Sequence, residues 1–137
     1  MKVFLSHAHS DKALAKRVAE GLKRAGLEVW DAESEILPGE NWADKTAQAL
    51  RDSQAMVVLL TPNTFQSSNV SLEIGYALGS KEYKKRLIPV IVGSSDNIPQ
   101  KNFPWILNHF QMIELPEQRK QQDAGIKQIA QTLLEAA

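Results

Sequence analysis

The sequence feature that most restricts the fold is AMVVLLT at residues 55–61, an apolar run with no polar side chain before Thr61. A strand with one face in water would alternate apolar and polar residues, so an unbroken run is typical of a strand buried on both faces. Such strands occur in the middle of parallel sheets that carry helices on both sides. We therefore expect residues 55–61 to form the central strand of such a sheet.

Four other segments predict strands beside this one. They are residues 2–6 (KVFLS), 27–31 (LEVWD), 86–93 (RLIPVIVG) and 110–115 (FQMIEL), the last alternating like a half-buried edge strand. Pro89 has no backbone N–H, so we expect it to move its strand toward a sheet edge or a bulge.

Helical patterns separate the predicted strands. Ser10 can cap a helix in which apolar residues recur at helical spacing until Gly26, and residues 42–52 repeat the pattern. Thr61-Pro62 is a plausible start for a helix that reaches about Ser80. Pro116 opens a last helix, whose apolar face is formed by Ile126, Ile129, Ala130, Leu133 and Leu134.

This alternation of strands and helices predicts an α/β fold with right-handed crossovers. We expect a flavodoxin-like three-layer sandwich, with a five-stranded parallel sheet in the order 2-1-3-4-5 and helices on both faces. A chain of 137 residues is long enough for one core, so residues 1–137 are expected to form a single domain, which can be part of a longer protein.

Charge and composition exclude several functions. Sixteen basic residues balance sixteen acidic ones, so no overall field draws the chain to nucleic acid or to anionic lipid. The absence of cysteine removes disulfides, thiolate metal sites and thiol catalysis, and it favours the cytoplasm. No stretch approaches the roughly 20 apolar residues of a membrane span, and no export signal is visible. We therefore expect a soluble cytoplasmic domain with no nucleic-acid or membrane partner.

The expected topology places a binding crevice beyond the carboxyl ends of the strands, where the strand order reverses between the first and third strands. Ser6, His7 and Ala8 follow the first strand, Asp31 ends the second, and Thr61 ends the third. Glu73 lies on the helix that is expected to leave the same crevice.

Several chemistries common to this fold lack their residues here. No G-x-G-x-x-G or G-x-x-x-x-G-K-[ST] follows a strand, which disfavours hydride and phosphoryl transfer. Thr61 stands where a phosphoacceptor receiver domain would need an Asp, and Ser6-His7 stand where it would need acids. His7 and His9 have no third ligand nearby, so we expect a polar turn there and no metal.

Glu73 is the remaining candidate for chemistry. It lies at the edge of an apolar helical stripe, so it can face the crevice or, alternatively, lie exposed in water. Gly75 and Gly79 lower helix propensity by about 1 kcal/mol each relative to Ala, which suggests a close approach of backbone or ligand. A lone carboxylate can hold ribose hydroxyls or stabilise positive charge at an anomeric carbon. Both roles suit cleavage of an N-glycosidic bond.

Four stretches of the chain follow the order of a known family. VFLSHAHSDKALAKRVAEGLKRAGLEVWD is similar to its first strand, helix and second strand, and ESEILPGENW to the loop that follows. SQAMVVLLTPNTFQSSNVSLEIGYAL resembles its third strand and third helix, and RLIPVIV its fourth strand. By the combined order and spacing of these motifs, the chain resembles the TIR (Toll/interleukin receptor) domain in its bacterial NAD-cleaving form.

The resemblance implies an enzyme that cleaves NAD⁺ as its substrate, without a resident cofactor or metal. The catalytic Glu of the family's third helix matches Glu73, which is expected to contact the nicotinamide-proximal ribose. The positions that match the family's substrate pocket are Ser6, His7, Ala8, Asp31, Trp42 and Asn69.

Asn69 is a departure from the family's pattern, because many enzymatic members carry W-x-x-x-E on this helix. Asn69 can hydrogen-bond the substrate or cap a helical segment. The stacking aromatic is then expected at Trp42, Phe65 or Tyr76. Trp42 can stack on a base or on the nicotinamide, or alternatively pack against the core.

Three functions stay open at this point, of which the first is favoured. It is cleavage of NAD⁺ to nicotinamide and ADP-ribose or a cyclic ADP-ribose isomer, which the resemblance links to bacterial anti-phage signalling and to activation by self-assembly. The second is a non-catalytic interaction module that self-associates through the loop from Glu33 to Asn41. The third is a nucleoside deoxyribosyltransferase-like enzyme, because EIGYAL also resembles the helix that carries the nucleophilic Glu of those enzymes.

Overall fold

The computed structural model describes most of the chain. The described residues are 1–31, 37–64, 70, 72–75, 87–93, 112–116 and 121–136. Pro62 and Asn63 form a turn, so the prediction that a helix starts at Thr61-Pro62 is wrong. Residues 65–69, 71, 76–86 and 94–111 lie outside the described part, and so does the predicted end of that helix near Ser80.

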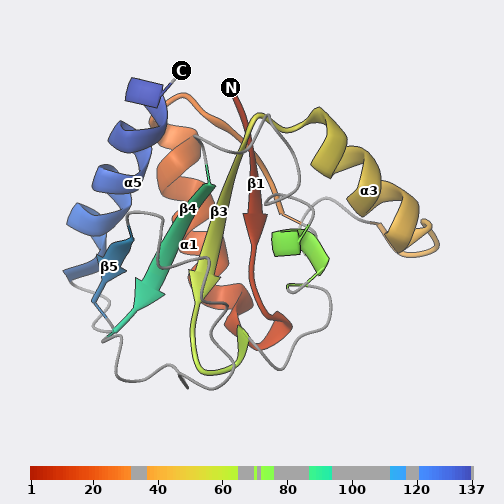
Figure 1. The fold of residues 1–137 in the computed structure, drawn as a ribbon, viewed down its shortest axis with the longest axis horizontal. Coiled ribbons are helices and arrows are strands. Elements are labelled where there is room, and N and C mark those ends of the chain that lie inside the picture. The colour runs from red at the N-terminus through yellow and green to blue at the C-terminus, as the bar shows by residue number, and fades with distance from the viewer. Residues whose placement is uncertain are drawn as a thin grey trace.

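The sheet has five parallel strands in the order β2-β1-β3-β4-β5 (Figure 1). This confirms the order expected from the sequence. The strands are β1 (Lys2–Ser6), β2 (Glu28–Trp30), β3 (Ala55–Leu60), β4 (Leu87–Val92) and β5 (Ile113–Leu115). Every residue of β3 is fully buried, which is why its sequence is an unbroken apolar run.

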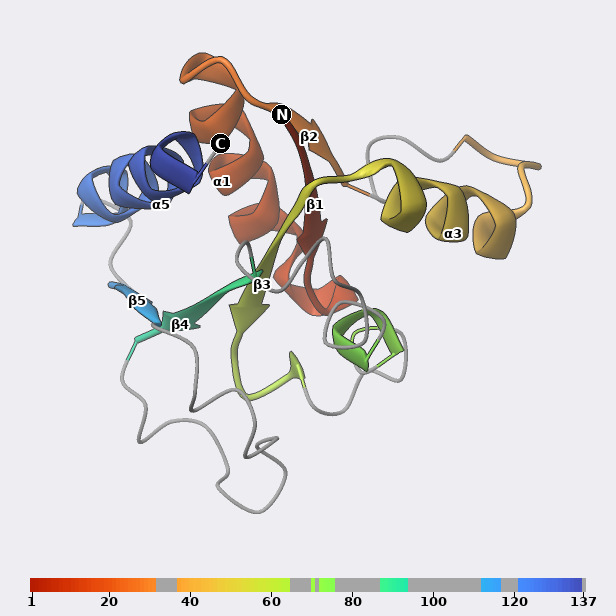
Figure 2. The ribbon, with the colours of Figure 1, turned by 45° about the horizontal axis from the view of Figure 1, so that its top comes forward.

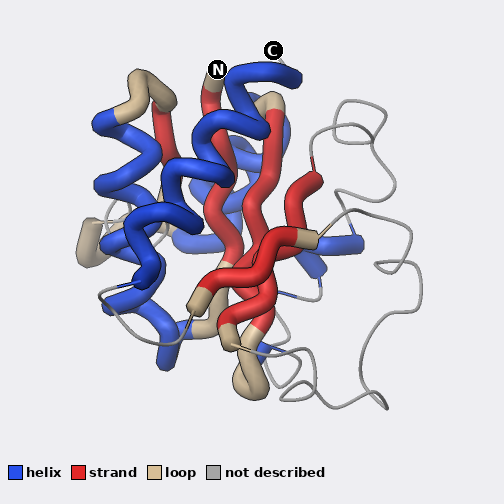
Figure 3. The backbone as a smooth tube through the Cα atoms, turned by 90° about the vertical axis from the view of Figure 1, so that its left-hand side faces the viewer, coloured by secondary structure: helices blue, strands red, loops and turns tan. Residues whose placement is uncertain are grey.

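Helices cover both faces of the sheet (Figure 2). α1 (Lys12–Arg24) and α5 (Gln122–Ala136) lie together on one face, and Figure 3 shows this helical layer from the α5 side. α3 (Trp42–Asp52) lies on the other face, together with a helical segment at residues 70 and 72–75 that we call the Glu73 segment. This is the three-layer arrangement expected from the alternating pattern.

Alternate residues of the inner strands enter two separate cores. Leu5 and Val57 pack with the apolar faces of α1 and α5. Phe4 and Met56, their neighbours in sequence, pack on the opposite side with α3 and the Glu73 segment. Because successive side chains of a strand point to opposite faces, the inner strands must be apolar at every position.

Helix boundaries differ from the sequence-based expectation at one end of α1. A short 3-10 turn, η1 (His9–Asp11), precedes α1, and the N-cap residue is Asp11. The prediction that Ser10 caps this helix is therefore wrong. At the other end Gly26 has φ +95°, a left-handed conformation that glycine adopts without strain, and it ends the helix as predicted.

Two further predictions on the C-terminal half need correction. β4 pairs with both β3 and β5, and its register with β3 is continuous through Pro89, so the expectation of an edge position or a bulge is wrong. Pro89 nevertheless precedes the stretch Val90–Val92 that pairs with β5, so its missing N–H interrupts no described pairing with that strand. The helical spacing predicts Leu134 on the apolar face of α5, but this residue is 49% exposed because it lies at the margin of the stripe.

The last helix, α5, begins at Gln122 in the structure, six residues after the predicted opening at Pro116. Residues 117–120 lie outside the described part. Within the described residues, no helix is both long and apolar enough to cross a membrane.

Candidate functional site

The carboxyl ends of three neighbouring strands bring the predicted site residues to one edge of the sheet. Ser6 is the last residue of β1 and pairs in register with Val58 of β3. Asp31 directly follows β2, which pairs with β1 on the other side. Residues 6–8 therefore lie between the ends of β2 and β3, as the topology predicts.

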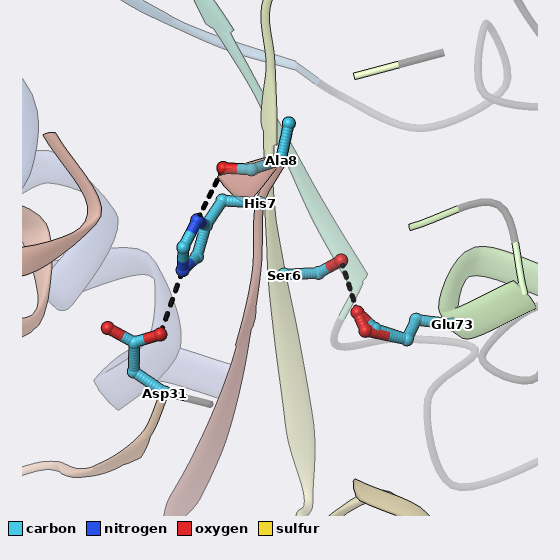
Figure 4. A network of polar contacts seen from close by, with 5 residues as sticks. All are labelled: Ser6, His7, Ala8, Asp31 and Glu73. Atoms are coloured by element: carbon cyan, nitrogen blue, oxygen red, sulfur yellow. Dashed lines mark hydrogen bonds and ion pairs between the residues drawn. The ribbon is translucent and has the colours of Figure 1, made fainter. Parts of the chain in front are cut away.

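Ser6 and Glu73 are in direct contact (Figure 4). The Ser6 hydroxyl donates a hydrogen bond to Oε1 of Glu73 at 3.1 Å, across 67 residues of sequence. Glu73 is 9% exposed and Ser6 1% exposed. This excludes the alternative that Glu73 is an ordinary solvated glutamate of a surface helix. The neighbours Val70 and Ile74 are buried in the core, so the apolar side of the segment carries Glu73 toward β1.

Burial gives Glu73 an unusual proton affinity. Desolvation raises the pKa of its carboxyl from an ordinary value of 4.5 to about 7, because a buried charge loses its hydration. The Ser6 hydrogen bond and the positive charge of His7 both act in the opposite direction, and they are smaller. Near neutral pH the carboxyl is thus poised between its acid and its carboxylate forms.

His7 points away from Glu73 and binds Asp31 (Figure 4). Its Nε2 lies 2.8 Å from Oδ1 of Asp31, and the two side chains are 4% and 5% exposed. Its Nδ1 lies 2.8 Å from the carbonyl oxygen of Ala8. A carbonyl and a carboxylate both accept hydrogen bonds, so the imidazolium form, with two N–H donors, makes both contacts. The adjacent residues Ser6 and His7 therefore bind side chains that lie on opposite sides of the end of β1 (Figure 4).

The structure does not place the other predicted site residues with the same detail. Trp42 is the first residue of α3, but its side chain is outside the described part, and so are Asn69, Phe65 and Tyr76. The proposed substrate contacts of these residues stay predictions. At Gly75 an added Cβ would meet no described atom within 4 Å, so no close backbone approach is seen there. In the described residues no three His, Asp or Glu side chains gather as a metal site.

Sequence reasoning missed one polar cluster at the same edge. The Thr61 hydroxyl at the end of β3 donates to Oδ2 of Asp11 at 2.7 Å, and Thr64 binds Thr61 through backbone and side chain. The sequence signal for it is weak, because Thr61 directly follows β3 but Asp11 lies five residues after β1, and short polar residues are common in ordinary turns.

Several known proteins are similar to this chain in sequence or in structure. The NAD(+) hydrolase TcpA of Theionarchaea archaeon (strain DG-70-1) is 32% identical over 90 residues, which cover 64% of this chain and 27% of that protein. A metazoan TIR-STING receptor from C. gigas, solved in complex with 2′,3′-cGAMP, has a TM-score of 0.74 at 23% identity over 96% of this chain and 38% of that one. The RPS4 and RRS1 TIR domain heterodimer has a TM-score of 0.57 at 18% identity, with 99% and 98% covered.

The chain spans well under half of the length of TcpA and of the TIR-STING receptor chain. The match to a family model covers far more of the sequence of this chain: residues 3–130 match the model described as the TIR domain. These residues include β2 to β5, all of β1 except Lys2, most of α5, and Ser6, His7, Asp31 and Glu73. The resemblance inferred from the motifs is thereby confirmed, and the chain belongs to the TIR domain family.

Proposed function

We propose that this domain cleaves the nicotinamide–ribose bond of NAD⁺. The observation that carries the proposal is a buried carboxylate, Glu73, held by the Ser6 hydroxyl at the strand-order reversal of the sheet. The name of the archaeal relative, an NAD(+) hydrolase, supports the same reaction. Membership of the TIR family favours it over the nucleoside deoxyribosyltransferase alternative.

In the proposed reaction, the bond between the ribose anomeric carbon and the pyridinium nitrogen breaks. Its electron pair goes to the nitrogen, so nicotinamide leaves as a neutral molecule and needs no acid. Positive charge develops on the ribose, and an ionised Glu73 stabilises it. Water then attacks the anomeric carbon and loses a proton to give ADP-ribose, or a nucleophile within the same ADP-ribose unit replaces water to give a cyclic isomer.

The described side chains take distinct roles in this proposal. Ser6 binds one carboxylate oxygen of Glu73 and so limits its rotation, which keeps the charge directed at one point. The His7–Asp31 pair fixes the backbone that carries Ser6, and the positive charge of His7 lowers the pKa of Glu73. Low exposure strengthens these interactions, because water does not screen them.

The pH dependence of turnover tests this assignment. Glu73 must be ionised to stabilise a cation, and its pKa is about 7, so nicotinamide release is expected to rise with pH and level off above neutrality. The Ser6→Ala variant is expected to move the midpoint to higher pH, because the Ser6 hydrogen bond lowers the pKa of Glu73. The matched control is Ser53→Ala, which removes a buried hydroxyl bound to the Ala49 carbonyl at the end of α3. An unchanged midpoint in Ser6→Ala would contradict the role given to Ser6.

We also propose self-association through the loop before α3, of which residues 37–41 are described. Glu40 holds this turn: its carboxylate accepts from the Leu37 N–H at 2.8 Å and pairs with Lys45 at 3.0 Å. These contacts lower the pKa of Glu40 and keep it charged. Leu37 is 64% exposed on the turn, so an apolar side chain is presented on a fixed backbone.

This loop is expected to make turnover depend on protein concentration. Leu37→Ser should reduce assembly in light scattering and lower the specific activity at high concentration, because an apolar contact between copies is lost. Leu134→Ser is the control, since Leu134 is also exposed but lies on α5. Equal assembly by wild type and Leu37→Ser would argue against the loop as the contact. A role in anti-phage signalling stays a prediction from the family resemblance.

A further inference from the structure

A second polar cluster lies at the carboxyl ends of β1 and β3, apart from the Ser6 and His7 contacts. It consists of Asp11, at the end of η1, and of Thr61 and Thr64, just after β3. Thr61 is 5% exposed and Thr64 is fully buried. The Thr61 hydroxyl donates to Oδ2 of Asp11 at 2.7 Å, which joins two segments 50 residues apart in sequence.

The direction of each hydroxyl in this cluster is fixed. The Thr64 hydroxyl donates to the Leu59 carbonyl at 2.9 Å and accepts from the Thr61 N–H at 2.8 Å. The Thr61 oxygen accepts from the Asn63 N–H at 3.2 Å. The single hydroxyl proton of Thr61 therefore goes to Asp11, whose carboxylate is an acceptor. The cluster is an ordered chain of contacts that starts inside β3.

Asp11 is placed for a different contact from the one that it makes. It is the N-cap residue of α1, a position where Asp commonly accepts from a helix N–H, yet its side chain makes no capping hydrogen bond. The carboxylate reaches across to Thr61 instead. A hydrogen bond between η1 and the residue after β3 thus replaces the local cap. This indicates that the Asp11 side chain connects these two segments.

The backbone of Asp11 links this tie to the crevice. Its N–H donates to the Ala8 carbonyl at 2.9 Å, the same oxygen that His7 Nδ1 contacts at 2.8 Å. On one side the tie therefore holds the turn that carries Ser6 and His7. On the other side it holds the end of β3, from which the chain continues toward the Glu73 segment.

We propose that Asp11 is a positioning residue, whose hydrogen bond from Thr61 holds the turn after β1 against the segment after β3 and thereby keeps Ser6 within reach of Glu73. This inference rests on the crevice of the proposed function but assigns it two residues that make no contact with Glu73 in the described structure. Displacements of about 1 Å at a reacting group can cost on the order of 100-fold in rate, so a tie of this kind matters for turnover.

The test compares Asp11→Ala, Asp11→Asn and Thr61→Val. Asp11→Ala and Thr61→Val are each expected to lower kcat by about 10-fold or more with a smaller change in KM, because alignment and not binding is lost. Asp11→Asn keeps an acceptor oxygen and is expected to retain most of the activity. The double variant Asp11→Ala/Thr61→Val should be no slower than either single variant, because all three lack the same hydrogen bond.

A second readout separates this proposal from the proposed function. The titration of the Glu73 carboxyl, followed by NMR of the intact chain, should shift to higher pH in Asp11→Ala and Thr61→Val as contact with Ser6 weakens. This shift is measurable even if the wild type cleaves no NAD⁺. Controls are Thr132→Val, which removes an exposed hydroxyl on α5, and Asp52→Ala at the end of α3. Folded Asp11→Ala and Thr61→Val with unchanged Glu73 titration, or Asp11→Asn as impaired as Asp11→Ala, would overturn the proposal.

Discussion

The Glu73→Gln variant is expected to release nicotinamide from NAD⁺ at least about 100-fold more slowly than the wild type. Gln keeps the size and the acceptor oxygen that binds Ser6, so the crevice retains its shape. It cannot carry the negative charge that stabilises the developing cation. Because Glu73 is 9% exposed, no water layer can take over that charge. Steady-state kinetics with saturating NAD⁺ measure the change in kcat directly.

Glu20→Gln is the matched control for this substitution. Glu20 lies exposed on α1, on the other face of the sheet, so the same chemical change there should leave kcat unaltered. If Glu73→Gln kept the turnover of the Glu20→Gln protein, the carboxylate would have no part in the reaction.

At pH 8 the same Glu73→Gln variant is expected to be more stable than the wild type. The pKa of Glu73 rises from 4.5 to about 7 on folding, so the folded protein holds a proton that the unfolded chain has released between these values. The wild type therefore loses stability as pH increases through this window, and the loss is complete above pH 7. The shift corresponds to about 3 kcal/mol, an order-of-magnitude value for a buried group. Gln does not titrate, so the Glu73→Gln variant does not lose this stability as the pH rises.

Urea unfolding of both proteins between pH 4 and pH 8 measures this effect. The free energy of unfolding of Glu73→Gln relative to the wild type should be lowest near pH 4 and increase until about pH 7. The Glu20→Gln control should follow the wild type. Two parallel profiles for wild type and Glu73→Gln would mean that burial does not perturb the carboxyl. Together the two expectations describe a residue that costs stability and supports activity.

The strand order could be derived from the sequence because each inner strand is buried on both faces. A strand buried on both faces has an unbroken apolar sequence, as in residues 55–60. Because such strands alternate with helical patterns, few sheet topologies are possible. The same topology placed Ser6, His7 and Asp31 at one edge. It could not show that Ser6 binds Glu73 while His7 binds Asp31, since that choice depends on side-chain direction in three dimensions.

Local features were less predictable where tertiary contacts compete with local ones. Ser10 is a good capping residue by type, but an added 3-10 turn moves the N-cap position to Asp11, whose side chain binds Thr61. The sequence also could not predict whether Glu73 is buried, because a residue at the edge of an apolar stripe can lie in the core or in water. Glu73 is buried because the sheet places β1 against that edge of the stripe.

The most direct test of the central claim is proton NMR of NAD⁺ incubated with the purified domain at high concentration, beside Glu73→Gln. The proposed function predicts that free nicotinamide resonances grow steadily with the wild type, together with ADP-ribose or a cyclic isomer, and that they do not grow with Glu73→Gln. Equal nicotinamide release by both proteins, or none from an assembled wild type at pH 8, would contradict the claim that Glu73 in this crevice cleaves NAD⁺.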